Sequence, residues 1–383
     1  MNKLSYLEKL LDGVEVKWLP LGHIAAIKTG QSVNKNMISK NPGVYPVINS
    51  GREPLGFINT WNTDNDPIGI TTRGAGVGSV IWQEGKYFRG NLNYSITIDK
   101  KSHINIRYMY HALLHMKNDI HELCTFDGIP ALNAGSLKKL LIPIPCPNNP
   151  EKSLAIQSEI VRILDKFTAL TAELTAELTA RKKQYNYYRD QLLSFEDGEV
   201  EWVVLGNLVD INTGSKPPEI YEKATDYDYI NAGTSRSGYS DESNCEGDTV
   251  TTPSRGQGGI GYVGYQKKPF WLGPLCYKFR AIDEELLVNK YLFYFLQSRN
   301  ELLLSLKKEG GVPAINKSDL VRLEVPVPPL VKQQKIVDVL DNFYTLITSI
   351  TEGLPREIEL RQKQYEYYRD LLFSFPKPDS VTN

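Results

Sequence analysis

The same series of short motifs occurs twice along the 383-residue sequence, in the same order. The second occurrence of each motif follows the first by 180 to 184 residues. The repeated motifs are Trp-x-x-Leu-Gly at 18–22 and 202–206, Thr-Gly at 29–30 and 213–214, Arg-Gly-x-Gly at 73–76 and 255–258, Gly-x-Pro-Ala-x-Asn at 128–133 and 311–316, Pro-x-Pro at 143–145 and 326–328, and Lys-Gln-Tyr-x-Tyr-Tyr-Arg-Asp at 183–190 and 363–370. Matches in one order at a nearly constant offset do not arise by chance, and they predict two copies of a unit of roughly 180 residues.

Each copy begins with a segment of about 130 residues that is rich in glycine, asparagine and threonine. Short runs of β-branched and aromatic residues, such as 80–82 and 94–98, predict strands between turns. Helical stretches are expected at 107–122 in the first copy and at 288–308 in the second. The Pro-x-Pro segments cannot continue a helix and are expected to end each globular module. The predicted module is therefore α+β.

A long helix is predicted after each module, because apolar residues recur there at every third or fourth position. The first stripe includes Ile156, Ile160, Leu164, Phe167, Leu170, Leu174, Leu178 and Tyr185, and the second includes Ile336, Leu340, Phe343, Leu346, Ile350, Tyr365 and Tyr368. A helix with one apolar stripe needs a partner, so the two helices are expected to pack as an antiparallel coiled coil. A stretch of roughly 40 residues is about 60 Å long. We therefore expect two similar globular domains that this coiled coil separates.

Three details refine this organisation. Two Thr-Ala-Glu-Leu tetrads at 171–178 place Leu170, Leu174 and Leu178 one turn apart, as a candidate spacer. Gly353 and Pro355 interrupt the second helix, so a kink or a break is expected there. The segment leading to Trp18 resembles the one leading to Trp202, which favours a cyclic arrangement with a pseudo-two-fold axis. The expected divisions are an N-terminal helix fragment at 1–13, module one at 14–147, a first long helix at 148–197, module two at 198–330, a second long helix at 331–375 and a tail at 376–383.

Composition excludes several classes of protein. With 41% hydrophobic and 23% charged residues, the chain is typical of a globular protein and not of a disordered one. No window approaches 18 consecutive apolar residues, and the first residues lack the pattern of a signal peptide, so no membrane partner is expected. The cysteines form no Cys-x-x-Cys pair, which favours a reduced, cytoplasmic location. They are Cys124, Cys146, Cys245 and Cys276.

The charge is distributed unevenly. The whole chain carries a formal charge of −1, which argues against a protein that binds polyanions over its whole surface. Module one has 14 Lys and Arg against 9 Asp and Glu, whereas module two has 14 against 18. Contact with nucleic acid would therefore need local basic loops, above all in module two.

Catalytic signatures are missing from the sequence. It contains no phosphate-binding loop, no His-Glu-x-x-His and no Gly-x-Ser-x-Gly motif. The glycine-rich segment 73–78 lacks the strand and helix that a nucleotide loop needs. His111 and His115 lie one helical turn apart, but no third ligand is evident and the second copy lacks both. A solvated or hydrogen-bonded helix face is expected there instead of a metal site.

Two kinds of repeated segment could bind partners. Arg73 and Arg255 lie beside glycines in equivalent loops, and arginine can bind phosphate or guanine through two hydrogen bonds. Each could equally be a tight turn whose arginine caps a strand or pairs with a carboxylate. The Thr-Gly loops at 28–32 and 212–216 have the same two interpretations. The Tyr and Arg residues of the last motif fit either a helix core or a surface for a protein partner.

The complete set of motifs resembles the specificity subunits of type I restriction-modification systems, over essentially the whole chain. In that family each globular module is a target-recognition domain that reads one half of a bipartite DNA sequence. The resemblance implies that the helices set the gap between the half-sites and dock two methyltransferase subunits. It implies further that motor-nuclease subunits then join this assembly. It also implies that the chain is not an enzyme and has no cofactor of its own, because S-adenosylmethionine, Mg²⁺ and ATP belong to the partner subunits.

The candidate residues follow from these motifs. Those expected to contact double-stranded DNA are Lys28, Thr29, Gln31, Thr72, Arg73, Gly74, Lys216, Arg236, Ser254, Arg255 and Gly256. Those expected to contact a protein partner are Tyr185, Tyr188, Arg189, Tyr365, Tyr368 and Arg369. Two alternatives come from other classes of protein, namely a stand-alone DNA methyltransferase or nuclease and a coiled-coil scaffold without DNA contact. Binding of S-adenosylmethionine by the isolated chain would favour the first, and salt-dependent DNA binding by the assembled complex would exclude the second.

Overall fold

The chain folds into two compact units. The computed structural model describes residues 14–51, 53–196, 198–256, 258–308, 311–349 and 351–376, so the helix fragment expected at 1–13 and the tail beyond Pro376 lie outside the described residues. Unit one combines Met1–Glu173 with Ile358–Asn383, and unit two is Leu174–Glu357. Each unit holds one module with parts of the long helices, so the division of the chain into units falls within the helices.

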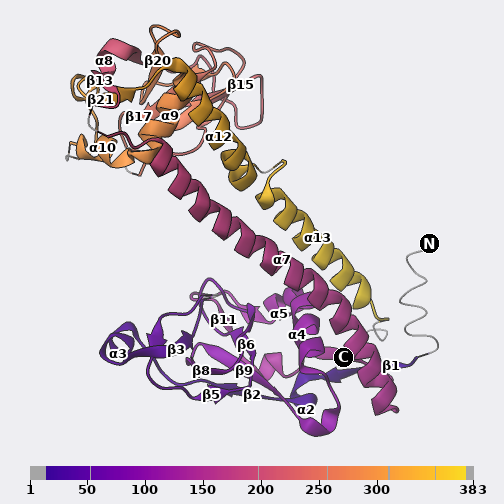
Figure 1. Cartoon of the computed structure of the whole chain (residues 1–383). Helices are drawn as coiled ribbons and strands as arrows, with labels where there is room; N and C mark the ends of the chain where they lie inside the picture. The colour runs from indigo at the N-terminus through magenta and orange to yellow at the C-terminus, as the bar shows by residue number, and fades with distance from the viewer. Residues whose placement is uncertain are drawn as a thin grey trace. The chain divides into compact units, whose positions relative to one another are not determined.

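Module one contains two four-stranded sheets and two short strand pairs (Figure 1). Its strands are β1 (Val16–Pro20), β2 (Ala25–Thr29), β3 (Pro42–Ile48), β4 (Phe57–Ile58), β5 (Thr63–Asp64), β6 (Ile68–Thr71), β7 (Val80–Trp82), β8 (Lys86–Arg89), β9 (Asn93–Ile98), β10 (Cys124–Thr125), β11 (Ala131–Leu132) and β12 (Leu141–Pro145). One sheet has the order β2-β9-β6-β7, and the other has the order β4-β3-β8-β5 with β3 parallel to β8. The pairs are β1 with β12 and β10 with β11. The strands expected at 80–82 and 94–98 are confirmed as β7 and β9.

Module two repeats most of this topology. Its strands are β13 (Glu201–Val204), β14 (Val209–Thr213), β15 (Tyr227–Ile230), β16 (Gly238–Ser240), β17 (Thr249–Pro253), β18 (Gly264–Gln266), β19 (Trp271–Leu272), β20 (Cys276–Ala281) and β21 (Glu324–Val327). The order β14-β20-β17-β18 matches the first sheet of module one, and β15 runs parallel to β19 as β3 does to β8. The second sheet has the order β16-β15-β19 among the described residues. The sequence repeat is therefore a structural repeat.

The Trp-x-x-Leu-Gly motif begins each module because it pairs with the Pro-x-Pro motif that ends it. Trp18 lies opposite Pro143 in the β1–β12 pair, and Trp202 lies opposite Pro326 in the β13–β21 pair. Proline is tolerated in such two-stranded pairs because one side of each strand needs no backbone donor. The Pro-x-Pro segments thus form the closing strand of each module.

The helical stretch expected in each module is a pair of helices. The pairs are α4 (Ile106–His115) with α5 (Lys117–Glu122), and α9 (Asn289–Ser298) with α10 (Asn300–Ser305). Shorter helices are α2 (Leu21–Ile24), α3 (Lys35–Lys40), α6 (Ala134–Leu137), α8 (Leu205–Leu208) and α11 (Lys317–Leu320), with a 3-10 turn at Lys100–Ser102. Asn105 caps α4, since its side chain accepts hydrogen bonds from the backbone N–H groups of Arg107 and Tyr108.

Two buried polar residues recur in the two copies, one that makes a bond within the module and one that joins the module to the helix that follows it. The Tyr108 hydroxyl donates to the carbonyl oxygen of Pro143 at 2.7 Å. The side-chain oxygen of Gln157 accepts a hydrogen bond from the backbone N–H of Asn105 at 2.8 Å. In unit two the equivalent bonds join Tyr291 to Pro326 and Val288 to Gln333, both at 2.9 Å. The sequence analysis did not single out these residues, although their matching positions in the two copies are a signal of their importance.

The first long helix, α7 (Pro150–Leu192), is unbroken over 43 residues (Figure 1), which corresponds to about 65 Å. In unit one its first half packs on the end of α13 (Leu354–Leu372), where the rings of Phe167 and Tyr368 stack at 5.1 Å. In unit two its second half packs on α12 (Leu330–Thr348), where Tyr188 stacks on Phe343 at 5.8 Å. The α+β class and the antiparallel packing of the long helices are therefore confirmed.

The second helical stretch, expected over 331–375 with a kink or a break at Gly353 and Pro355, is broken there. Helix α12 ends at Thr348, and α13 begins at Leu354. A Cβ on Gly353 would lie 2.7 Å from the carbonyl oxygens of Thr345 and Leu346, so this residue has to be glycine for the chain to pass so close to the end of α12. Pro355 lies in the first turn of α13, where a missing N–H breaks no helical hydrogen bond.

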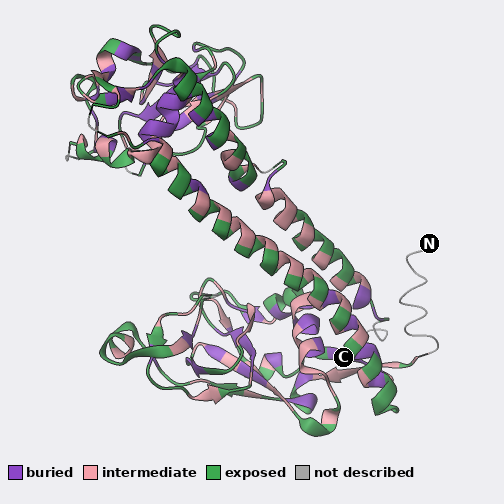
Figure 2. Ribbon diagram, in the orientation of Figure 1, coloured by how far each residue is buried: buried purple, intermediate pink, exposed green. Residues whose placement is uncertain are grey.

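Burial is concentrated in the modules and at the ends of the long helices (Figure 2). In unit one, Tyr108, Ile156, Ile160, Leu372 and Phe373 belong to one buried cluster. Along the middle of α7, exposed residues alternate with half-buried ones, and Leu170, Leu174 and Leu178 are half-buried. No helix among the described residues is long and apolar enough to cross a membrane.

Candidate nucleic-acid interface

In each module the Arg-Gly loop is paired with the repeated Gly-x-Pro-Ala-x-Asn motif. In module one the backbone N–H of Gly74 donates to the carbonyl oxygen of Pro130 at 2.9 Å, and the N–H of Leu132 donates to that of Thr72 at 2.8 Å. The equivalent bonds in module two run from Gly256 to Pro313 at 3.0 Å and from Ile315 to Ser254 at 2.9 Å. Glycine is favoured at 74 and 256 because the backbone there has φ values of +90° and +124°. Two motifs distant in sequence thus form one rigid rim in each module.

Arg73 and Arg255 lie exposed on these rims. Neither side chain makes a hydrogen bond or an ion pair with any residue that the structure describes. Thr72 and Ser254, which precede them, are buried and hold the loop by their backbone groups. The structure therefore removes the interpretation in which these arginines pair with a described carboxylate, and it leaves both guanidinium groups available.

The Thr-Gly loops pack closely on the neighbouring chain in both modules. A Cβ on Gly30 would overlap the carbonyl oxygens of Arg89 and Gly90, and one on Gly214 would overlap that of Leu272. Close packing within the protein accounts for these glycines. The candidates beside them, which are Lys28, Thr29, Gln31 and Lys216, all have exposed side chains.

A polar cavity of about 350 Å³ lies beside the Thr-Gly loop of module one, where Lys28, Thr29 and Gln31 come together with Asp66 and Arg89. Arg89 is only 3% exposed, and it donates hydrogen bonds to the side-chain oxygen of Asn93 at 2.6 Å and to the carbonyl oxygen of Asp66 at 2.7 Å. Its Nε has no partner in the described part of the chain. Burial lowers the pKa of the Arg89 guanidinium, although Tyr87 and Asp66 oppose that change.

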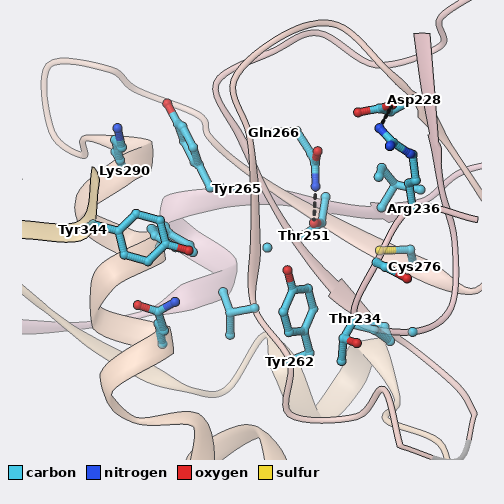
Figure 3. A pocket seen from close by; sticks show the side chains of 18 residues that line it. Asp228, Thr234, Arg236, Thr251, Tyr262, Tyr265, Gln266, Cys276, Lys290 and Tyr344 are labelled. Carbon is cyan, nitrogen blue, oxygen red and sulfur yellow. Dashed lines mark hydrogen bonds and ion pairs between the residues drawn. The ribbon is translucent and has the colours of Figure 1, made fainter. Parts of the chain in front are cut away.

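A second cavity, of about 460 Å³, lies in module two (Figure 3). Polar residues from several elements line it. Arg236 is one of them, and its Nη1 atom lies 3.1 Å from the carboxylate of Asp228. The Arg236 guanidinium also lies 4.5 Å from the centre of the Tyr239 ring. These two contacts orient an arginine that remains about half exposed. The structure thus places Arg236 beside this cavity.

Side chains at equivalent positions differ between the two copies. Arg107 lies over the Trp82 ring at 4.4 Å in module one, whereas Lys290 lies 5.1 Å from the Tyr265 ring at the equivalent place in module two. The buried Arg89 has Leu272 as its counterpart, at the same offset of 183 residues. The sequence analysis missed these residues. A position-by-position comparison of the two copies would have found them.

The Tyr and Arg motif of the long helices has a buried and an exposed side. Tyr185 is 4% exposed and its hydroxyl donates to Gln297 at 3.0 Å, so it belongs to the core of unit two and not to a surface for a partner. Tyr365 is partly buried and bonds His111 at 2.9 Å. The outer residues, which occupy equivalent places on the two helices, are Tyr187, Tyr188, Tyr367 and Tyr368.

Tyr187 and Tyr188 meet edge to face at 5.4 Å, and Tyr367 and Tyr368 meet in the same way at 5.4 Å. Arg189 and Arg369 lie over the rings of Tyr185 and Tyr365 at 5.6 Å, and each pairs with the next residue, Asp190 or Asp370. Their side chains are only 17% and 16% exposed. Tyr187 and Tyr367 are 59% and 47% exposed, and they were absent from the sequence-based candidates. Each helix end thus presents the same exposed aromatic pair.

The two histidines on α4 have hydrogen-bonding partners within unit one. His111 Nε2 lies 2.7 Å from Asp165, and its Nδ1 lies 2.9 Å from the Tyr365 hydroxyl. His115 Nδ1 lies 2.9 Å from Asp370. The expected hydrogen-bonded helix face is present, and no group of three or more His, Cys, Asp or Glu that could hold a metal occurs among the described residues.

Comparison with known proteins places both copies in one family. A model of the type I restriction modification DNA specificity domain matches residues 13–181 and again residues 198–360. The chain is 41% identical, over the full length of both proteins, to the EcoR124I/EcoR124II specificity subunit of Escherichia coli. It is 33% identical to the EcoprrI specificity subunit of Escherichia coli, over 92% of this chain and 93% of that protein. The crystal structure of the type I restriction-modification S subunit from M. genitalium has the same fold, with a TM-score of 0.68, 19% identity and coverage of 97% and 98%.

Proposed function

The chain belongs to the DNA specificity subunits of type I restriction-modification systems, and from that premise we propose that each of its modules reads one half of a bipartite DNA sequence. Module one (14–147) and module two (198–330) are the proposed reading units. The long helices set the gap between the half-sites. A specificity subunit is a recognition component and not the enzyme, which excludes the alternative of a stand-alone methyltransferase or nuclease.

The observation that carries this proposal is one topology with two different sets of side chains. The four-stranded sheets β2-β9-β6-β7 and β14-β20-β17-β18 have the same order and the Arg-Gly rim recurs, but equivalent side chains differ, as Arg89 and Leu272 exemplify. Two identical modules related by a two-fold axis would bind two identical half-sites, so their DNA target would be a palindrome. Modules that share a scaffold and differ in side chains suit an asymmetric target.

The proposed partners are double-stranded DNA, two methyltransferase subunits and motor-nuclease subunits. The tyrosine pairs at 187–188 and 367–368 are the proposed docking points for the methyltransferase subunits, because exposed aromatic residues beside an arginine are frequent anchors in protein interfaces. S-adenosylmethionine, Mg²⁺ and ATP would bind to those partner subunits. The proposed location of DNA recognition by this chain is the cytoplasm.

The test is to map methylated bases in DNA modified by the complex of this chain with its methyltransferase subunits. We expect a target of two different half-sites with a fixed gap. Arg236→Ala in module two should relax the sequence of one half-site only and should leave the other half-site and the gap unchanged, with a cost of about 1–3 kcal/mol if this arginine contacts a base. Arg322→Ala is the control, because Arg322 is exposed near the closing strand β21 and away from the cavity.

Three results would contradict the proposal. A palindromic or undivided target would exclude bipartite reading by two different modules. A change of both half-sites by Arg236→Ala would exclude independent modules. DNA binding that does not weaken with salt would favour the scaffold alternative, because displacement of counterions by Lys and Arg makes binding steeply dependent on salt concentration.

A further inference from the structure

Each module presents an arginine and a branched aliphatic side chain on two facing loops. In module one Arg73 pairs with Ala131 in an isolated antiparallel bridge, and Ile129 lies two positions before that alanine. In module two Arg255 pairs with Ala314, and Val312 takes the equivalent place. The arrangement is therefore the same in both copies.

These four side chains are exposed and contribute little to the packing of the fold. The loops are held together by backbone groups, for example by the N–H of Gly74 and the carbonyl oxygen of Pro130. Ile129 is 69% exposed and Val312 is 56% exposed, so neither contributes much to a core. Within the described ranges, the arginines form no side-chain hydrogen bond or ion pair. A repeated combination that the fold does not need points to a shared ligand.

The side chains around the rims are only partly shared. The cavity beside the rim of module two is lined by Arg236, Tyr265, Cys276 and Phe293, and the last three correspond to Trp82, Asn93 and Tyr110 at the offset of 183 residues. In a protein whose modules read different half-sites, residues that differ can carry sequence information. Residues that are the same in both modules suit the part of DNA that is the same everywhere, which is the sugar–phosphate backbone.

On the basis of the proposed function, we propose that Arg73 with Ile129 and Arg255 with Val312 form two equivalent, sequence-independent contacts with the DNA backbone. The guanidinium binds phosphate oxygens, for which its planar donors are well suited. The aliphatic side chain packs on the neighbouring deoxyribose. These contacts set the position of each module on the duplex, while the residues that differ between the modules read the bases.

The test uses the complex with its methyltransferase subunits and measures affinity for cognate and scrambled DNA at several salt concentrations. Arg73→Ala and Arg255→Ala should each weaken binding to both DNAs by the same factor, about tenfold, because a charge-assisted bond is lost. Each should also reduce the slope of log affinity against log salt by about 1. Arg73→Lys and Arg255→Lys should keep that slope, since the charge remains near the phosphate.

The aliphatic residues provide an independent measurement. Ile129→Ala and Val312→Ala should lower the affinity for both DNAs by a few-fold. The slope of log affinity against log salt should stay the same, because an apolar contact releases no counterion. Ile129→Val and Val312→Ile, which exchange the residues of the two copies, should bind like the wild type. Thermal unfolding of each variant checks that the rims remain folded, as their backbone bonds predict.

The outcomes separate this proposal from the proposed function. Two results would overturn the proposal while leaving the bipartite function intact: a change in base preference within one half-site on Arg73→Ala or Arg255→Ala, or unchanged affinity in folded variants. Loss of binding by the lysine variants as large as by the alanine variants would favour guanine reading and would also overturn it. If the wild-type complex did not prefer the cognate DNA at all, the proposed function itself would fail.

Discussion

At the scale of single residues, two of the glycine pairs that recur in both copies allow close approaches between segments of the chain. Gly22 and Gly206 follow the first strand of each module, and a Cβ there would lie 2.9 Å from the Cβ of Lys138 or Val321. A Cβ on Gly30 or Gly214 would overlap the backbone carbonyl oxygens of the neighbouring segment. The repeat therefore preserves glycine where two segments touch, and a ligand is not needed to explain it.

We predict that Gly214→Ala destabilises unit two by more than about 2 kcal/mol, because the new methyl group overlaps the backbone of Leu272. Gly311→Ala in the same module is the matched control. A Cβ at Gly311 meets no atom within 4 Å, so this change should alter the free energy of unfolding by no more than about 0.5 kcal/mol. Chemical denaturation of both variants measures the difference. Equal stability of the two would show that the loop moves freely away from Leu272.

His111 makes the stability of unit one dependent on pH. Burial lowers the pKa of its ring below the ordinary value of 6.5, although the hydrogen bond to Asp165 opposes this. The unfolded chain therefore binds a proton near pH 6 that the folded chain does not, and the stability of unit one falls as the pH falls through 6.5. Hydrogen exchange of unit-one peptides at pH 7.5 and about 5.5 measures this effect, after correction for the intrinsic exchange rates.

His111→Gln is the comparison for this prediction. Glutamine keeps a hydrogen-bond donor but does not titrate, so the loss of protection on acidification should be smaller than in the wild type. Unit two has Tyr294 at the equivalent place, hydrogen-bonded to Asp341, and serves as the internal control. An equal acid sensitivity of the variant and the wild type would assign the effect to other groups.

At the scale of elements, the two long helical stretches differ in length and continuity. Gln157 and Tyr185 are 28 positions apart in α7, whereas their counterparts Gln333 and Tyr365 are 32 positions apart. The longer stretch is the one in which α12 ends at Thr348 and α13 begins at Leu354.

We predict that deletion of residues 175–178, one Thr-Ala-Glu-Leu tetrad, shortens the unread gap in the DNA target by one or two base pairs. The deletion removes about 6 Å of helix and changes the helical phase by only about 40°, so the apolar stripe through Leu170 and Leu174 nearly keeps its direction. A base-pair step is roughly 3.4 Å. Both half-site sequences should remain as they are, and methylation mapping measures the gap.

Thr179→Ala is the control for the tetrad deletion, because it removes one hydroxyl and leaves the helix length unchanged. An unchanged gap with full activity in the deletion variant would refute the spacer role of 171–178. Altered half-site sequences would refute the independence of the modules.

At the scale of the whole molecule, unit one is completed by the far end of the chain. Leu372, Phe373 and Phe375 are at most 5% exposed and pack with Ile156 and Ile160 of α7. The Trp18 side chain donates a hydrogen bond to the carbonyl oxygen of Pro376 at 2.8 Å. In unit two the corresponding segment follows α7 directly, so that unit needs no chain terminus.

A chain that ends at Asp370 should therefore lose the fold of unit one and keep that of unit two. Removal of three large buried side chains, at about 3–5 kcal/mol each, is comparable to the whole stability of a domain, which is about 5–15 kcal/mol. A chain that ends at Pro376 retains all three and should behave like the full-length protein. Hydrogen exchange reports on each unit separately. Full protection of unit one in the shorter chain would contradict the role of this segment.

Assembly is predicted to follow the repeat, with two methyltransferase subunits for each specificity chain. Tyr187→Glu should leave a complex with one methyltransferase subunit, and Tyr367→Glu should do the same at the other site, because a charge at an interface centre lacks a partner. Both side chains are largely exposed, so the isolated chain should remain folded. Native mass spectrometry counts the subunits. A wild-type complex with a single methyltransferase subunit would refute the equivalence of the two sites.

The sequence by itself determined the repeat, the α+β modules and the long helices. Motif order and offset are properties of the chain alone, and an apolar residue at every third or fourth position has few stable solutions other than a packed helix. The interruption at Gly353 and Pro355 was predictable for the same reason, since proline lacks the N–H that a helix interior requires.

Only the tertiary structure decided which motifs meet and which side chains remain available. Arg73 and Ile129 are 56 positions apart, and their loops come together through backbone hydrogen bonds that carry no mark in the sequence. Tyr185 and Tyr187 belong to one motif, yet the turn of α7 sends the first into the core and leaves the second exposed. Burial depends on neighbours that are distant along the chain, and for that reason local patterns could nominate these residues but could not assign their roles.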